Sequence, residues 1–173
     1  MDHAKKRGMS GHLKSFDRDE HRTYDSKGKR AALDAIGKHL FLSKGLRTVE
    51  NPDRYGIDLL TLNENDEVVA CWEVEVRHGN WSGNVPFPFR DINCIERKDH
   101  QWRKDESFLK GIPYKTTEDL KVFYMQLNKE CNRAVIIKGD TVLKYPLKPW
   151  RNRKASGEYV RQVPITETTQ IIF

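Results

Sequence analysis

The chain has 173 residues, with 31 Lys and Arg against 25 Asp and Glu, which gives a net charge of +6 at pH 7. This length suits one domain, because a domain typically holds about 150 residues, and an aromatic content of 10 % argues against simple disorder. The longest apolar run, residues 68–72, is far shorter than the roughly 18 residues that a membrane span needs, so the sequence predicts no membrane location.

The cysteines indicate a reducing environment. Cys71, Cys94 and Cys131 are odd in number and widely spaced, and they form no CxxC or CxxH pattern. This spacing argues against a disulfide framework and against a zinc finger, so we expect a cytoplasmic protein. The basic balance favours a polyanionic partner such as nucleic acid.

The first predicted element is an amphipathic helix that begins at residue 26 and ends near Gly45. Its apolar positions recur at steps of three and four residues, which is typical of one buried helical face: Ala32, Leu33, Ile36, Leu40 and Phe41. Residues 1–25 lack such a period, and we expect an N-terminal basic arm there. Residues 26–173 are then predicted to form a single α/β domain.

Three extended segments follow the predicted helix, at residues 46–50, 56–62 and 67–77. The last two are separated by the polar residues 63–66, and a short polar link between apolar runs is typical of a β-hairpin. Residues 78–115 are punctuated by glycine and proline, and we expect a long irregular insertion.

The last third of the chain is predicted to contain a second helix and several strands. Leu120, Phe123, Tyr124 and Leu127 have helical spacing within residues 116–131. Strands are expected at 133–138 and 141–145, with a further strand at 158–165. The order of elements predicts an α/β fold in which a mixed sheet is flanked by helices.

Carboxylates are concentrated on the predicted hairpin. Glu73 and Glu75 lie on the same face of the strand over 67–77, roughly 7 Å apart. If the four-residue loop closes the hairpin symmetrically, Asp58 lies opposite Cys71 and diagonal to Glu73, about 7–8 Å away. Three carboxylates so close together repel one another, and Mg²⁺ or Mn²⁺ would relieve that repulsion. The alternative is an ordinary solvated strand face.

Three short motifs mark this hairpin and the loop before it: Pro52-Asp53, Gly56-Ile57-Asp58 and Glu73-Val74-Glu75. With the order of the elements over residues 26–138, they resemble the PD-(D/E)XK nuclease superfamily. The resemblance implies a restriction-endonuclease-like core, in which a helix, three strands, a helix and a strand (α-β-β-β-α-β) follow one another.

The resemblance also implies metal ligands and catalytic residues. Asp58 and Glu73 correspond to the metal-binding acids, with Asp53 as the alternative to Asp58. Glu75 stands where the motif normally has lysine, as in some restriction endonucleases. Asp58, Glu73 and Glu75 are therefore expected to hold Mg²⁺ or Mn²⁺.

A cation from elsewhere in the chain is expected to replace the missing motif lysine. Arg77 shares the face of the two glutamates, and Lys98 follows the apolar run of residues 92–95. We favour Lys98 as the residue that assists the attacking water, because a compact ammonium suits that role better than a guanidinium, which never deprotonates.

The implied function is that of a Mg²⁺-dependent endonuclease that hydrolyses phosphodiester bonds, with DNA favoured over RNA. Many endonucleases of this superfamily dimerise, so a homodimer is an expectation as well. Because Glu75 replaces lysine, the alternative is a nuclease-like domain without catalysis, acting as a nucleic-acid-binding or protein-binding accessory factor.

Basic residues outside the hairpin are the predicted contacts to nucleic acid: Arg77, Arg97, Arg103, Lys104, Arg151, Arg153 and Lys154. Those of residues 78–115 are interleaved with four aromatic residues, Trp81, Phe87, Phe89 and Trp102. Two interpretations stay open: the rings stack on bases, or they pin a long loop to the core. The basic cluster around Trp150 likewise either contacts phosphates or is simply solvated.

Overall fold

The computed structural model describes residues 18–40, 45–53, 55–77, 79–150 and 157–173. Its elements in chain order are α1 (Arg18–Ala35), the π-helical turn η1 (Ile36–Leu40), β1 (Arg47–Glu50), β2 (Leu59–Leu62), β3 (Val68–Val76), β4 (Asp91–Ile95), the 3₁₀ turn η2 (Glu96–Lys98), α2 (Asp99–Trp102), α3 (Glu106–Lys110), β5 (Thr116–Leu127), β6 (Arg133–Lys138), α4 (Gly139–Val142), β7 (Leu147–Pro149), β8 (Tyr159–Pro164), the 3₁₀ turn η3 (Ile165–Glu167) and β9 (Thr169–Ile172).

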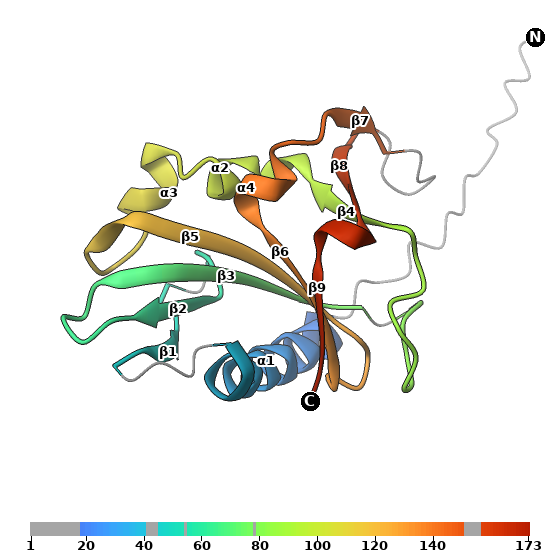
Figure 1. Cartoon of the computed structure of the whole chain (residues 1–173), viewed down its shortest axis with the longest axis horizontal. Helices are drawn as coiled ribbons and strands as arrows, with labels where there is room; N and C mark the ends of the chain where they lie inside the picture. Colours follow the sequence, from blue (N-terminus) through green and yellow to red (C-terminus); the bar gives the residue numbers. More distant parts are fainter. Residues whose placement is uncertain (1–17, 41–44, 54, 78, 151–156) are drawn as a thin grey trace, which may run out of the picture.

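The strands form two sheets. The larger has the order β1-β2-β3-β5-β6-β9, and the smaller has the order β4-β8-β7. In the larger sheet β3 and β5 are parallel, whereas the other neighbouring pairs are antiparallel. Figure 1 shows α1 on one face of the large sheet and the short helices with the small sheet on the other. The predicted mixed sheet flanked by helices is therefore confirmed.

Each face of the large sheet buries its own apolar cluster. On the α1 side, Ile36 packs against Leu59, Trp72 and Met125. Gly28 lets the helix approach β3 closely, because a Cβ atom there would lie 2.5 Å from the Cγ2 atom of Val76. The opposite cluster is larger and includes Cys71, Ile92, Trp102, Val122 and Tyr124.

The first helix begins at Arg18 rather than at residue 26, so residues 18–25 of the predicted arm belong to α1. The rest of that arm, residues 1–17, lies outside the described residues. In the described part of the chain, every helix is too short or too polar for a bilayer span.

The predicted helix over residues 116–131 is wrong, because this segment forms the central strand β5. Leu120, Val122 and Tyr124 face one apolar cluster, while Met125 and Leu127 face the other. Only residues 124–127 of this strand are all buried, and where both faces are covered the polar and apolar residues need not alternate, so apolar positions can coincide with a helical spacing.

Other boundaries also differ from the predictions. Residues 133–138 form a strand as predicted, but the strand expected at 141–145 is wrong, because these residues form the end of α4, a turn and a bend. The tail strand expected at 158–165 is confirmed as β8, whereas β7 and β9 were not predicted. The expected irregular insertion contains β4, η2, α2 and α3, which together connect the parallel strands β3 and β5.

Candidate functional site

The β2–β3 hairpin brings Asp58 beside Glu73. Leu59 pairs with Trp72, so the next position along the two strands places Asp58 opposite Glu73, not opposite Cys71 as predicted. The register differs by two positions, one because Leu62 pairs with Val68 and not with Glu67, and one because the pairing shifts between Thr61 and Leu62. The Asp58 carboxylate accepts a hydrogen bond from the backbone N–H of Val74 at 2.8 Å, which holds it against β3.

A cavity of about 320 Å³ lies over this part of the hairpin. All the residues predicted to be catalytic line this cavity: Asp58, Glu73, Glu75 and Lys98. In the chain, 40 positions (98 − 58) separate the first of these residues from the last. The rest of the lining comes from Val74, Cys94, Ile95, Arg97, Trp102 and Tyr124. We call this space the carboxylate cavity.

Two lysines neutralise carboxylates of the carboxylate cavity. Lys29 from α1 forms an ion pair with Asp58, with Nζ 2.8 Å from Oδ1. Lys98 forms an ion pair with Glu73, and the side chain of Gln101 donates a hydrogen bond to the Oε2 atom of the same glutamate at 3.3 Å. Glu73 is buried, and a buried carboxylate without such partners would be costly.

Glu75 has a different kind of partner. The buried Tyr124 hydroxyl donates a hydrogen bond to its Oε2 atom, and Gln126 in turn donates one to the Tyr124 oxygen at 2.7 Å. Burial first and the negative charge of Glu75 second raise the pKa of Tyr124 well above its ordinary value. The phenol therefore keeps its proton and orients Glu75 as a donor throughout the physiological pH range.

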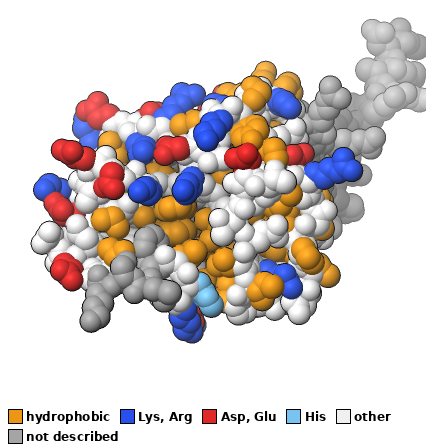
Figure 2. Space-filling model, in the orientation of Figure 1, with side chains coloured by type: hydrophobic (Ala, Val, Ile, Leu, Met, Phe, Trp, Pro, Cys, Tyr) orange, Lys and Arg blue, Asp and Glu red, His pale blue; other side chains and the backbone are white. Residues whose placement is uncertain are grey.

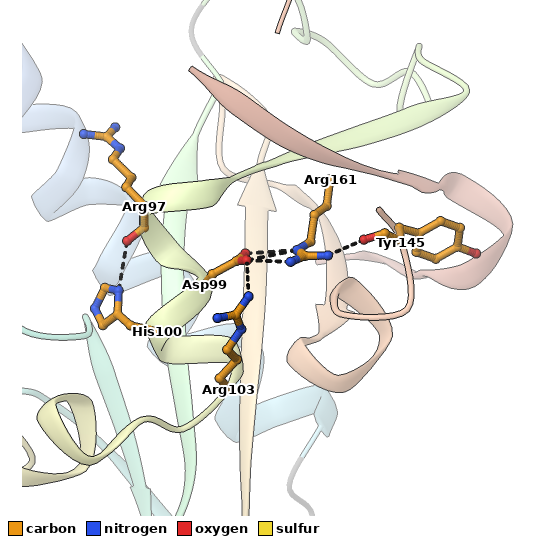
Figure 3. Close-up of polar contacts among 6 residues, drawn as sticks. All are labelled: Arg97, Asp99, His100, Arg103, Tyr145 and Arg161. Atoms are coloured by element: carbon orange, nitrogen blue, oxygen red, sulfur yellow. Dashed lines mark hydrogen bonds and ion pairs between the residues drawn. The ribbon is translucent and has the colours of Figure 1, made fainter. Parts of the chain in front are cut away.

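The turn that carries Lys98 is held by an ion pair between the next residue, Asp99, and Arg161 of the small sheet. Asp99 and Arg161 of β8 are both buried, and the guanidinium contacts the carboxylate with Nη2 2.6 Å from Oδ2 and Nε 3.1 Å from each oxygen. Arg161 also donates to the carbonyl oxygen of Tyr145, and the ring of His100 donates to the carbonyl of Arg97 at 2.9 Å (Figure 3). The small sheet thus fixes where Lys98 stands.

Asp53, the alternative to Asp58, does not line the carboxylate cavity. Its carboxylate accepts a hydrogen bond from the backbone N–H of Tyr55 at 3.0 Å, within the loop that leads into β2. Of the two cations weighed for the missing motif lysine, Lys98 lines the cavity and Arg77 does not. The Arg77 guanidinium instead lies over Phe87 and Phe89, 5.6 Å and 5.3 Å from the ring centroids.

The remaining predicted nucleic-acid contacts are dispersed. Arg97 is exposed at the cavity, Arg103 lies 3.4 Å from Asp99, and Lys104 donates to the Leu120 carbonyl at 3.2 Å. Arg151, Arg153 and Lys154 lie outside the described residues. On the face shown in Figure 2, basic and acidic side chains are interspersed.

The aromatic residues of the insertion mostly pin it to the core. Trp81, Phe87 and Trp102 are buried, so stacking of bases on these three rings is wrong. Burial is favoured because such large rings contribute much apolar area to the core. Phe89 is 38 % exposed.

The described residues contain no group of three His, Cys, Asp or Glu side chains placed to hold a metal ion. A pair of carboxylates, Asp58 and Glu73, does line one cavity. Mg²⁺ is commonly held by one or two carboxylates while it keeps several waters, so this oxygen pair fits the chemistry of that ion.

Sequence reasoning missed three residues that the site uses. Lys29, Gln101 and Tyr124 reach the acids from α1, α2 and β5, elements distant from the hairpin in the chain. No local motif marks them, because their roles depend on which elements pack together.

Comparisons with protein-family models, with curated proteins and with solved structures find no match.

Proposed function

We propose that the chain is a divalent-cation-dependent nuclease with a restriction-endonuclease-like core, and that the carboxylate cavity is its active site. The observation that carries this proposal is the meeting of Asp58, Glu73, Glu75 and Lys98 around one cavity. These are the residues that the resemblance to the PD-(D/E)XK superfamily selects.

The order of elements supports the same proposal only with a different second helix, because the helix predicted over residues 116–131 is the strand β5 and the short helices α2 and α3 precede it. The resemblance implies a helix, three strands, a helix and a strand, and the chain has α1, β1 to β3, the short helices α2 and α3, and then β5. The chain departs from that order by inserting β4 before the short helices and by having only short helices at that point.

Asp58 and Glu73 are the residues that would hold Mg²⁺ or Mn²⁺, and such an ion acidifies bound water and offsets the charge that develops on a phosphate. Lys98 stands at the same cavity and contributes a positive charge to orient an attacking water. Glu75, held by Tyr124, is placed to accept a proton from that water. Hydrolysis would join the water oxygen to phosphorus and break one phosphodiester P–O bond, and the departing sugar oxygen would take up a proton from solvent water to leave as a hydroxyl.

The test compares Glu73→Gln with the wild type on single- and double-stranded DNA and RNA, with Mg²⁺, with Mn²⁺ and with EDTA. We expect the wild type to cut only with the metal, and the variant to lose at least about 100-fold in rate, because a ligand of the ion is gone. Glu67→Gln is the matched control: Glu67 belongs to the same hairpin, pairs with Lys115 and does not line the cavity. Full activity of Glu73→Gln would overturn the proposal.

A second candidate function, binding without catalysis, is favoured by the ion pairs. Asp58 and Glu73 each already have a lysine partner, so their charges are compensated without a metal ion. Calorimetry with Mg²⁺ and Mn²⁺ separates the two functions, since binding of the ion that Asp58→Asn abolishes supports the nuclease. Nucleic-acid binding without ion binding supports the second candidate.

A further inference from the structure

Asp58 is fixed to the large sheet by its backbone and by one of its two carboxylate oxygens. Its carbonyl oxygen accepts a hydrogen bond from the backbone N–H of Asn51 at 2.9 Å. Its Oδ2 atom accepts one from the backbone N–H of Val74 at 2.8 Å. Both donors are backbone groups, which cannot turn away from Asp58 unless the sheet opens. Of the two oxygens, Oδ1 is therefore the one whose partner can change.

The Oδ1 atom of Asp58 is held by a side chain that can move. Lys29 of α1 places its Nζ atom 2.8 Å from Oδ1, and the lysine side chain is 28 % exposed. The preceding residue, Gly28, keeps this part of the helix close to β3, because a Cβ atom there would lie 2.5 Å from the Cγ2 atom of Val76. A lysine ammonium stands on a flexible stem of four carbons. Lys29 can thus turn into water while its backbone stays in place.

Lys29 contacts Asp58 from outside the carboxylate cavity. The lining of that cavity includes Asp58 but not Lys29. Figure 1 shows α1 on one face of the large sheet, whereas the short helices that follow β4 lie on the other. Lys98, the partner of Glu73, belongs to η2 just before those helices and does line the cavity. An ion that enters the cavity would therefore reach Asp58 from a different side than Lys29 does.

The charges indicate how Lys29 affects the affinity for a cation. The cavity lining has three carboxylates against two cations: Asp58, Glu73 and Glu75, and Arg97 and Lys98. This lining has an excess of one negative charge, and Lys29 cancels that excess when it pairs with Asp58. The ammonium would also repel a divalent ion at the same oxygen, because charges a few ångströms apart interact strongly near a protein surface. Lys29 should therefore lower the affinity of the cavity for a divalent cation.

We infer that Lys29 competes with the divalent cation for the Oδ1 atom of Asp58 and so sets the cation concentration at which the carboxylate cavity fills. This inference concerns the regulation of the proposed active site, and it rests on the proposed function for the presence of an ion there. Without the ion, Lys29 compensates the charge of Asp58; when the ion binds, the ammonium turns into water. A lysine that only orients Asp58 for the ion would have the opposite effect, since its removal would weaken binding.

The experiment is a calorimetric titration of the full chain with Mn²⁺ alone, in the absence of nucleic acid. We expect Lys29→Met to bind Mn²⁺ about tenfold more tightly than the wild type, the scale of one partly exposed ion pair together with the repulsion between ammonium and ion. Lys38→Met is the matched control, because it also removes one positive charge from this helical segment. Lys38 is 70 % exposed, its Nζ atom lies 3.4 Å from Asp34, and it does not line the cavity. Its affinity for Mn²⁺ should equal that of the wild type.

Two further variants separate charge from packing at the same position. Lys29→Arg keeps the positive charge and should retain the affinity of the wild type for Mn²⁺. Lys29→Gln keeps a donor without the charge and should bind the ion more tightly, which tests the inference if Lys29→Met does not fold. Thermal denaturation adds a readout that needs no catalysis. In EDTA the melting temperature of Lys29→Met should lie about 2–4 °C below that of the wild type, and saturating Mn²⁺ should remove this difference.

The outcomes distinguish the inference from the proposed function. Equal or weaker binding of Mn²⁺ by Lys29→Met and Lys29→Gln would overturn the competition and leave the nuclease standing, provided that the wild type binds the ion. An equal gain in Lys38→Met would also overturn it, because net charge would then be the cause. No binding of Mn²⁺ by any of the proteins would reject the cation site, and with it both the nuclease and the competition.

Discussion

The β2–β3 hairpin and the β3–β5 connection supply opposite halves of the candidate site. The hairpin contributes the carboxylates of Glu73 and Glu75 from a strand whose pattern is visible in the sequence. The connection contributes Lys98 and Gln101, whose positions depend on the buried Asp99–Arg161 pair. The comparison shows that pairing between neighbouring strands positions the two glutamates. The positions of Lys98 and Gln101, which contact Glu73, depend instead on an ion pair between segments that are distant in the chain.

The largest effect is expected from breaking the anchor of the connection. Asp99→Ala leaves Arg161 buried without its main carboxylate, and the free energy of unfolding should fall by about 3–5 kcal/mol. Urea denaturation of the variant and the wild type measures this difference in the free energy of unfolding. Glu106→Ala is the control, because it breaks the exposed pair with Lys110 and should cost less than about 1 kcal/mol. Equal losses in the two variants would mean that the buried pair is not an anchor.

A smaller loss is expected from overpacking the other face of the hairpin. Gly28→Leu forces a side chain into the space that Val76 occupies and should lower the free energy of unfolding by about 1–3 kcal/mol. Gly37→Ala is the control, because its new methyl group would meet nothing within 4 Å. The gain in helix propensity should raise the free energy of unfolding by up to about 1 kcal/mol. Thermal and urea denaturation compare the two, and a neutral Gly28→Leu would contradict the close packing of α1 on β3.

Alkaline pH tests both regions at once, because each holds one buried thiol. Burial raises the pKa of Cys71 and of Cys94 from 9.0 to about 12. The folded state keeps these protons, so the stabilisation is complete below pH 9 and is lost as the pH rises from 9 towards 12. At pH 10 the loss should be about 1.4 kcal/mol for each thiol.

The check on the thiols is urea denaturation at pH 8 and pH 10. Cys71→Ala should reduce the fall of stability between these pH values by about half of the thiol contribution, and Cys94→Ala should do the same. An unchanged pH dependence in both variants would show that other groups cause the fall.

The smallest effect on stability is expected where the two regions meet, at Tyr124. Tyr124→Phe removes the hydroxyl that orients Glu75, so metal-dependent cleavage should fall about tenfold, while the free energy of unfolding changes by about 1 kcal/mol or less. Tyr159→Phe is the control, and an unaltered rate of cleavage in Tyr124→Phe would remove Tyr124 from the site.

Much of the sheet was predictable, but its centre was not. β1, β2, β3 and β6 follow from apolar patterning and turn residues, whereas β5 was predicted as a helix. β5 lies between β3 and β6, and its residues 124–127 are all buried, so at this end of the strand polar and apolar residues do not alternate. The edge strands β7 and β9 are short, and their few residues carry too little pattern to be recognised.

By itself, the sequence determined the helix–hairpin beginning of the domain and the residue types around Asp58, because local periodicity and turn chemistry act between near neighbours. Only the tertiary structure decided that Asp58 stands opposite Glu73, that Lys29 and Lys98 pair with these acids, and that Asp53 belongs to a second cavity. The physical reason is that a bulge, a buried ion pair and a parallel crossover depend on segments that meet only after folding.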